Sequence, residues 1–204
     1  EQSHVVETEL DEGGWRRRET AHDTSWNLWN GNVVGGSSNF MSGFFHRLKP
    51  VDFKQLSTFG PIEGANVVDW PISYDELEPY YTKVEHVVGV SGRVVDHPHQ
   101  EPRSTPDFPY PPTAEHPISG LIDQACDKLG IHSAPMPRAI LSKPHLGRQS
   151  CSYNGYCGSY GCATGAKGSS RAALLNHAVA GGRCTILPNS QVTRLQSDSG
   201  GRIT

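Results

Sequence analysis

Glycine and proline are unevenly spread along this chain, and their placement restricts the fold more than any other feature. Dense runs of the 22 glycines and 15 prolines lie in residues 31–47, 93–117 and 148–168. Glycine loosens the backbone, whereas proline fixes φ and removes a hydrogen-bond donor, so such runs interrupt helices and strands. We therefore expect a few regular elements joined by long irregular loops that cover a ligand or another surface.

The charge and hydropathy of the chain argue against several classes of function. A net charge of -3, from 18 basic and 21 acidic residues, gives no field that would gather nucleic acid or an anionic membrane. No apolar run reaches the roughly 18 to 20 residues that span a bilayer, and the charged opening segment lacks the apolar core of a signal peptide. Nucleic-acid partners are not expected. The compartment stays open, and a periplasmic location or membrane association through partner proteins is compatible with the sequence.

Three segments carry helix signals. Ser73 followed by Glu76 forms a capping box, and apolar residues then recur at helical spacing as far as Gly89. Pro79 falls inside this pattern and is expected to kink or split the helix. Two further helices are expected over residues 118–129 and about 170–180.

The end of the chain has a strand pattern. Residues 184–196 alternate apolar and polar side chains, and Pro188 marks a bend between two short strands. Residues 1–30 are interpreted as a loop or extended arm. A helix followed by strands is typical of an α/β fold, here one with α+β elements. We expect an arm and ligand-contacting loop region at 1–70, a helical and proline-rich lid or substrate-side region at 71–150, and a cysteine-rich loop, helix and strands at 151–204.

The segment GNVVGGSSNFMSGFFHR, residues 31–47, is the first with chemical content. Gly35 and Gly36 lack a Cβ and let the backbone approach a ligand, while Ser37 and Ser38 offer hydroxyls and amides to phosphate oxygens. A cofactor loop and a tight turn before a helix both fit this pattern.

Three segments in fixed order resemble the middle section of the glucose-methanol-choline (GMC) oxidoreductases. They are GNVVGGSSNFMSGFFHR, DWPISYDELEPYYTKVEHVVGVSG and GAKGSSRAALLNHAVAGGRCTILPNSQVTRL. The resemblance runs from about residue 26 to the end and is strongest to the branch of bacterial sugar and polyol dehydrogenases. It implies part of an FAD-binding domain, the start of a substrate domain, and a dehydrogenase that passes a hydride from an alcohol carbon to FAD. A small subunit and a cytochrome are partners in that branch.

The resemblance also implies roles for individual residues. The second FAD signature of the family matches Gly35, Gly36, Ser37 and Ser38, followed by flavin-side positions at Asn39 and Met41 and by an adenine-side position at Val192. In some relatives the residue four places after the glycine pair is a histidine that bonds covalently to the flavin. Phe40 stands there in this chain, so we expect FAD to be bound non-covalently.

Two family motifs are missing from these residues. The GxGxxG strand-turn-helix and the histidine pair, or histidine and asparagine, that forms the catalytic base do not occur. We therefore expect an internal fragment or subunit that contains no catalytic residue and is completed by the remainder of the enzyme or by a partner chain. Two rival interpretations remain, an oxygen-using alcohol oxidase of the same family and a non-catalytic binding or structural subunit of a larger complex.

Three of the five cysteines lie on a glycine-rich loop, as Cys151-x5-Cys157-x4-Cys162. Thiolates on such a loop can wrap an iron-sulfur cluster, and some dehydrogenases of the similar branch are believed to hold one before the matching Gly-Ala-Lys segment. The spacing differs from familiar ferredoxin spacings. A disulfide between two of the three, or free thiols, is the alternative.

Overall fold

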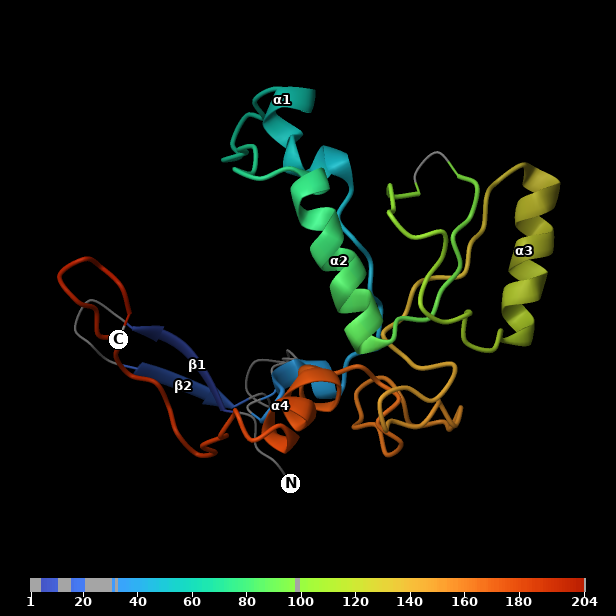
Figure 1. Cartoon of the computed structure of the whole chain (residues 1–204). Coiled ribbons are helices and arrows are strands. Elements are labelled where there is room, and N and C mark those ends of the chain that lie inside the picture. The colour runs from blue at the N-terminus through green and yellow to red at the C-terminus, as the bar shows by residue number, and fades with distance from the viewer. Residues whose placement is uncertain (1–4, 11–15, 21–30, 32, 98–99, 204) are drawn as a thin grey trace.

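The computed structural model describes residues 5–10, 16–20, 31, 33–97 and 100–203 (Figure 1). Long irregular segments separate short regular elements, which confirms the expectation from the glycines and prolines. In chain order the elements are strands β1 (Val5–Leu10) and β2 (Arg16–Thr20), 3-10 helices η1 (Gly36–Asn39) and η2 (Pro50–Phe53), helices α1 (Gln55–Phe59), α2 (Tyr74–Val88) and α3 (Pro117–Leu129), the π-helical turn η3 (Arg171–Leu175) and helix α4 (Asn176–Ala180). None of the described helices is long and apolar enough to cross a bilayer.

Helix α2 begins and ends where its capping signals lie. The Glu76 amide donates to Ser73 Oγ over 3.2 Å, and the Ser73 amide donates to Glu76 Oε2 over 2.7 Å. Gly89 ends the helix in the left-handed region, at φ 78°. The expected split at Pro79 is wrong, because α2 runs through this residue. The alternative, a kink, stays a prediction. Pro79 falls in the second turn, where its missing amide removes a single bond near an already capped end.

The other two expected helices are present, with one difference in type. Helix α3 spans Pro117–Leu129 and ends at Gly130, which has φ 65°. The third begins as the π-helical turn η3 and continues as α4. Ser169 caps it, since its Oγ accepts from the Ala172 amide at 3.1 Å.

Both expectations about the two chain ends need correction. Residues 5–10 and 16–20 form an antiparallel pair of strands, where we expected a loop or extended arm. The other residues of 1–30 lie outside the described part of the chain. Residues 184–196 form no strand, and Leu187, Val192 and Leu195 are more than two-thirds exposed. A strand is stabilised by its neighbours, and no described segment pairs with 184–196.

The core lies where the end of α2 meets two distant segments of the chain. The Ala139 amide donates to Gly43 O, and the Gly168 amide donates to Ala139 O, each over 2.7 Å. A Cβ on Gly168 would lie 2.5 Å from Val88 Cγ1, so only glycine allows this approach. The segment at 139 therefore lies between the residues at 43 and those at 168, which follow the Gly35–Gly36 pair and the three loop cysteines in sequence. The buried apolar residues here are Val88, Val90, Ala139 and Ala173, with Ile140, Leu141 and Ala166 beside them.

Candidate functional site

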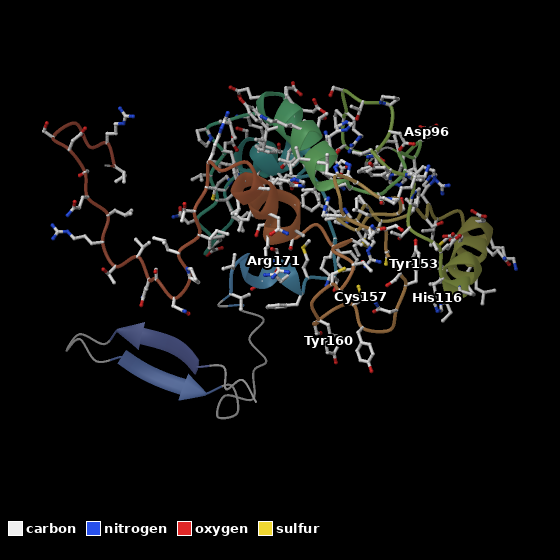
Figure 2. All side chains as sticks on the ribbon, turned by 60° about the horizontal axis from the view of Figure 1, so that its bottom comes forward. Asp96, His116, Tyr153, Cys157, Tyr160 and Arg171 are labelled. Carbon is white, nitrogen blue, oxygen red and sulfur yellow. The ribbon has the colours of Figure 1, made fainter. Side chains whose placement is uncertain are left out.

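The glycine turn, residues 35–39, docks on the start of η3. Ser38 Oγ donates to Gly35 O over 2.6 Å and accepts from the Ser170 amide over 3.0 Å. Ser170 Oγ also donates to Gly35 O, over 3.1 Å. Figure 2 shows Arg171, the next residue, beside this turn. Two segments more than 130 residues apart in sequence thus form one unit.

The two glycines differ in what surrounds them. Gly35 has φ 93°, and a Cβ there would lie 2.8 Å from Arg171 Cβ, so this glycine is required by contact with protein. Gly36 has φ 57°, and among the described residues a Cβ there would meet nothing closer than Gly31 O at 3.8 Å. The part of the chain that the structure describes therefore leaves space beside Gly36. A ligand can approach the backbone at this position, which fits the second FAD signature.

Side chains of the turn hold its own backbone. The Gly31 amide donates to Ser37 Oγ over 2.9 Å, and Asn39 Nδ2 donates to both Val34 O and Gly36 O over 2.9 Å. All of these residues except Val34 are half-buried. The turn is pre-ordered by bonds within the chain, so little conformational entropy would be lost on ligand binding.

The remaining FAD candidates lie in different surroundings. Met41 is half-buried and packs on the core cluster that contains Val88. Phe40 O accepts from the Ser159 amide at 3.1 Å, which ties the turn to the cysteine loop. Val192 is 77% exposed, and among the described residues no hydrogen bond links its segment to the turn. The structure therefore brings together residues 35–41 but leaves Val192 apart.

The cysteine loop packs beside this turn and is held by Lys167. Lys167 is buried, and its Nζ donates to Cys157 O over 3.1 Å and to Tyr160 O over 2.9 Å. All three cysteines line one small pocket, and all are free thiols, so the disulfide alternative is not observed. Within the described ranges, no three His, Cys, Asp or Glu side chains are gathered closely enough to hold a metal ion.

Cys162 lies in a setting that favours its thiolate. Burial raises the pKa of this thiol. Hydrogen bonds from Thr164 and from the Lys167 and Ala166 amides outweigh this effect, so the pKa lies below its ordinary value. Nearby Arg148 is buried and donates to Val88 O, while its Nε and Nη1 have no partner in the described structure. Burial lowers the Arg148 pKa. Sequence patterns did not reveal Arg148 or Lys167, although the basic residue of the Gly-Ala-Lys segment was a visible signal for the second.

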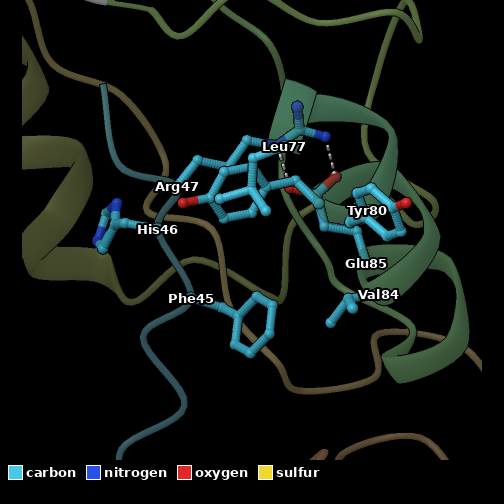
Figure 3. A pocket seen from close by; sticks show the side chains of 8 residues that line it. Phe45, His46, Arg47, Leu77, Tyr80, Val84 and Glu85 are labelled. Atoms are coloured by element: carbon cyan, nitrogen blue, oxygen red, sulfur yellow. Dashed lines mark hydrogen bonds and ion pairs between the residues drawn. The ribbon is translucent and has the colours of Figure 1, made fainter. Parts of the chain in front are cut away.

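A separate apolar cavity of about 260 Å³ lies along α2 (Figure 3). Its wall includes Phe45, Leu77, Tyr80 and Val84, and Arg47 and Glu85 pair at its edge. Apolar residues at helical spacing usually form the side of a helix that packs on the core, whereas Tyr80 and Val84 of α2 are exposed at 63% and 44%. This helix therefore presents part of its apolar side to the surface.

The comparison with known families now gives the class of the protein. The sequence model of the GMC oxidoreductase family matches residues 12–204. The chain belongs to the GMC oxidoreductase family, whose members bind FAD.

The chain is similar to curated proteins that are named as dehydrogenases or oxidases. The chain is 32% identical over 189 residues to paromamine 6'-oxidase of Streptomyces fradiae, covering 92% of this chain and 31% of that protein. It is 34% identical over 176 residues to the fructose dehydrogenase large subunit of Gluconobacter japonicus, covering 84% and 30%. It is 40% identical over 118 residues to 2-methyl-1,2-propanediol dehydrogenase of Mycolicibacterium austroafricanum, covering 58% and 20%. The chain thus spans a third or less of the length of these relatives.

Proposed function

We propose that this chain forms part of an FAD-dependent dehydrogenase that oxidises an alcohol carbon of a sugar or polyol. Family membership supports the flavin, and the names of relatives that act on fructose and on a propanediol support the substrate class. FAD supplies the hydride acceptor for this chemistry. The observation that carries the proposal is the pre-ordered turn at Gly35, with open space beside Gly36.

The residues of this chain are proposed to bind and orient FAD. Backbone at Gly35 and Gly36 would lie along the diphosphate, with Ser37 and Ser38 shaping the turn. Asn39 and Met41 are proposed to lie on the flavin side, and Val192 on the adenine side. The proton-accepting base is expected in the remainder of a longer protein or in a partner chain.

An absorption spectrum of the complete protein tests the flavin. Bands near those of free flavin are expected, and a colourless preparation that takes up no added FAD would refute the proposal. Acid precipitation tests the mode of attachment. Because Phe40 has no nucleophilic nitrogen, the yellow colour should remain in the supernatant, and colour in the pellet would disprove non-covalent binding.

An iron-sulfur cluster on Cys151, Cys157 and Cys162 is proposed as a second cofactor. Their common pocket supports it, although the thiols are not gathered as a ligand set in this structure. Iron analysis of protein isolated without oxygen tests the idea. Iron in stoichiometric amount that is lost in Cys157→Ser supports a cluster, and its absence from the unaltered protein ends the proposal.

The electron acceptor and partners are also proposals. A protein or quinone acceptor is favoured, with a small subunit and a cytochrome as partners, because relatives include a large subunit of fructose dehydrogenase and a gluconate 2-dehydrogenase flavoprotein. Such partners would also allow a periplasmic or membrane-associated location. Two relatives named as oxidases support oxygen as the alternative acceptor. Turnover with artificial dyes but not with oxygen separates the two.

A further inference from the structure

A second cavity, of about 300 Å³, lies between the segments at 93–101 and 132–137. No residue of the glycine turn or of the cysteine loop lines it. It has the size of a small-molecule site, since ligand pockets begin at about 300 Å³. Its wall mixes basic side chains with apolar ones, among them Phe108 and Met136.

The basic side chains of this cavity come from three separate parts of the chain. Lys49 is the N-cap residue of η2, and Arg93 and His97 follow α2. His132 comes after α3, and its ring meets the His97 ring edge-on, with centroids 4.8 Å apart. Figure 3 shows His46 pointing away from α2, on the opposite side from Arg47. His46 therefore adds a third histidine to this cavity.

The positive charge of this cavity is only partly balanced by the residues that the structure describes. Neither Lys49 nor Arg93 forms an ion pair with any described residue, whereas Arg47 and Arg103 nearby are both paired with Glu85. Glu101 is the one carboxylate among the described lining residues, and its Oε2 accepts from Gln100 Nε2 at 2.8 Å. Two permanent cations and one carboxylate thus line this concave site, together with three imidazole rings.

The loop that forms one wall is held in place by its own bonds. Gln100 Oε1 accepts from the Val95 amide at 3.3 Å, and the Gln100 amide donates to His97 O over 2.9 Å. On the other side, the Phe108 ring lies under the Arg103 guanidinium, 4.0 Å from it. This side of the cavity is therefore held by Arg103, which is itself paired with the buried Glu85.

We propose that this cavity binds a small organic oxyanion, with Lys49 and Arg93 pairing its negative oxygens and Phe108 and Met136 packing on its carbon skeleton. Carboxylate and phosphate groups share the chemistry that these donors recognise, and Arg93 can meet either with two parallel bonds. Because Lys49 and Arg93 are exposed to solvent, binding should weaken as the salt concentration rises. The proposal does not depend on bound FAD.

Calorimetric titration of the complete protein tests this site with two probes, gluconate for a carboxylate and glucose 6-phosphate for a phosphate. Saturable binding of one or both is expected at low salt, and the probe that binds more tightly identifies the source of the oxyanion. Lys49→Gln combined with Arg93→Gln should weaken that binding by about tenfold or more. The matched control is Lys83→Gln with Arg183→Gln, two exposed cations that do not line the cavity.

The comparison of oxyanion binding in the cavity variant, the control variant and the unaltered protein decides whether the cavity is the binding site. Loss in the cavity variant with retention in the control supports it. Equal loss in both variants shows non-specific attraction to charge and overturns it, as does absence of binding in the unaltered protein. If the charge variant fails to fold, Met136→Trp tests the same site by filling it without changing charge. Unchanged binding in Met136→Trp would then count against the cavity.

Discussion

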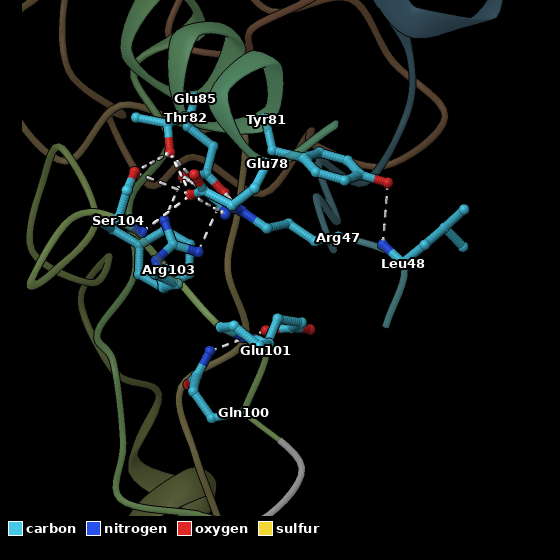
Figure 4. A network of polar contacts seen from close by, with 12 residues as sticks. Arg47, Leu48, Glu78, Tyr81, Thr82, Glu85, Gln100, Glu101, Arg103 and Ser104 are labelled. Atoms are coloured by element: carbon cyan, nitrogen blue, oxygen red, sulfur yellow. Dashed lines mark hydrogen bonds and ion pairs between the residues drawn. The ribbon is translucent and has the colours of Figure 1, made fainter. Parts of the chain in front are cut away.

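Arg47 and Glu85 form a two-bond ion pair in the interior of the molecule, with Nε 2.8 Å from Oε1 and Nη2 2.9 Å from Oε2 (Figure 4). Glu85 also accepts from Arg103, and Arg47 Nη1 reaches Glu78 Oε1 over 2.9 Å. Two guanidinium groups therefore face two carboxylates. The network joins the segment after the glycine turn to α2 and to the loop at 103, and thus positions both proposed sites.

Removing one charge from this network should destabilise the fold strongly. In Arg47→Met, Glu85 keeps only Arg103, and in Glu85→Gln, Arg47 keeps only Glu78. Either change leaves one buried charge of the network uncompensated, and such changes typically cost about 3–5 kcal/mol. The double change Arg47→Met with Glu85→Met should cost less than the sum of the two single changes. Denaturant unfolding measures these differences, with the exposed Lys83→Met as the control. Single variants within about 1 kcal/mol of the unaltered protein would contradict a structural role for the pair.

Acid should weaken the same network through Glu78. Burial raises the Glu78 pKa. Hydrogen bonds from Arg47, Ser104 and Thr82 outweigh this effect and lower the pKa from the ordinary 4.5 to about 2. Because the folded pKa lies below the unfolded one, the stabilisation is complete above about pH 4.5 and is lost as pH falls toward 2. The free energy of unfolding, measured by urea between pH 6 and 3, should fall less steeply in Glu78→Gln. Parallel curves for the two proteins would show that Glu78 does not titrate in this way.

The glycine pair allows steric and ligand effects to be separated. Gly35→Ala places a Cβ 2.8 Å from Arg171 Cβ at φ 93°, so it should lower stability more than Gly36→Ala, where only the positive φ of 57° costs about 1 kcal/mol. If FAD lies against Gly36, that variant should lose flavin despite its small loss of stability. Melting temperature and flavin per protein measure the two effects. Full flavin content in a folded Gly36→Ala protein would argue against contact there.

Local signals predicted the helices well, and non-local contacts account for what the sequence did not reveal. Ser73, Gly89 and Gly130 act within one turn of the helix ends they define, so their effect is visible in sequence. Residues 184–196 carry a strand pattern, but strand formation depends on partners that a pattern does not supply. The same holds for the candidate site. Gly36 was visible as a glycine, whereas the docking of Ser38 on Ser170, 132 residues away, is a contact that the sequence does not reveal.

The cysteine loop should open when its internal cation is removed. Lys167 Nζ holds the carbonyls of Cys157 and Tyr160, and the lysine is only 3% exposed. Lys167→Met keeps the apolar stem but leaves both carbonyls without this donor, so local opening of residues 151–162 should become easier. Amide hydrogen exchange of this loop should speed up by about tenfold, while exchange in α2 stays unchanged. The exposed Lys143→Met is the matched control, and equal exchange in both variants would show that Lys167 does not order the loop.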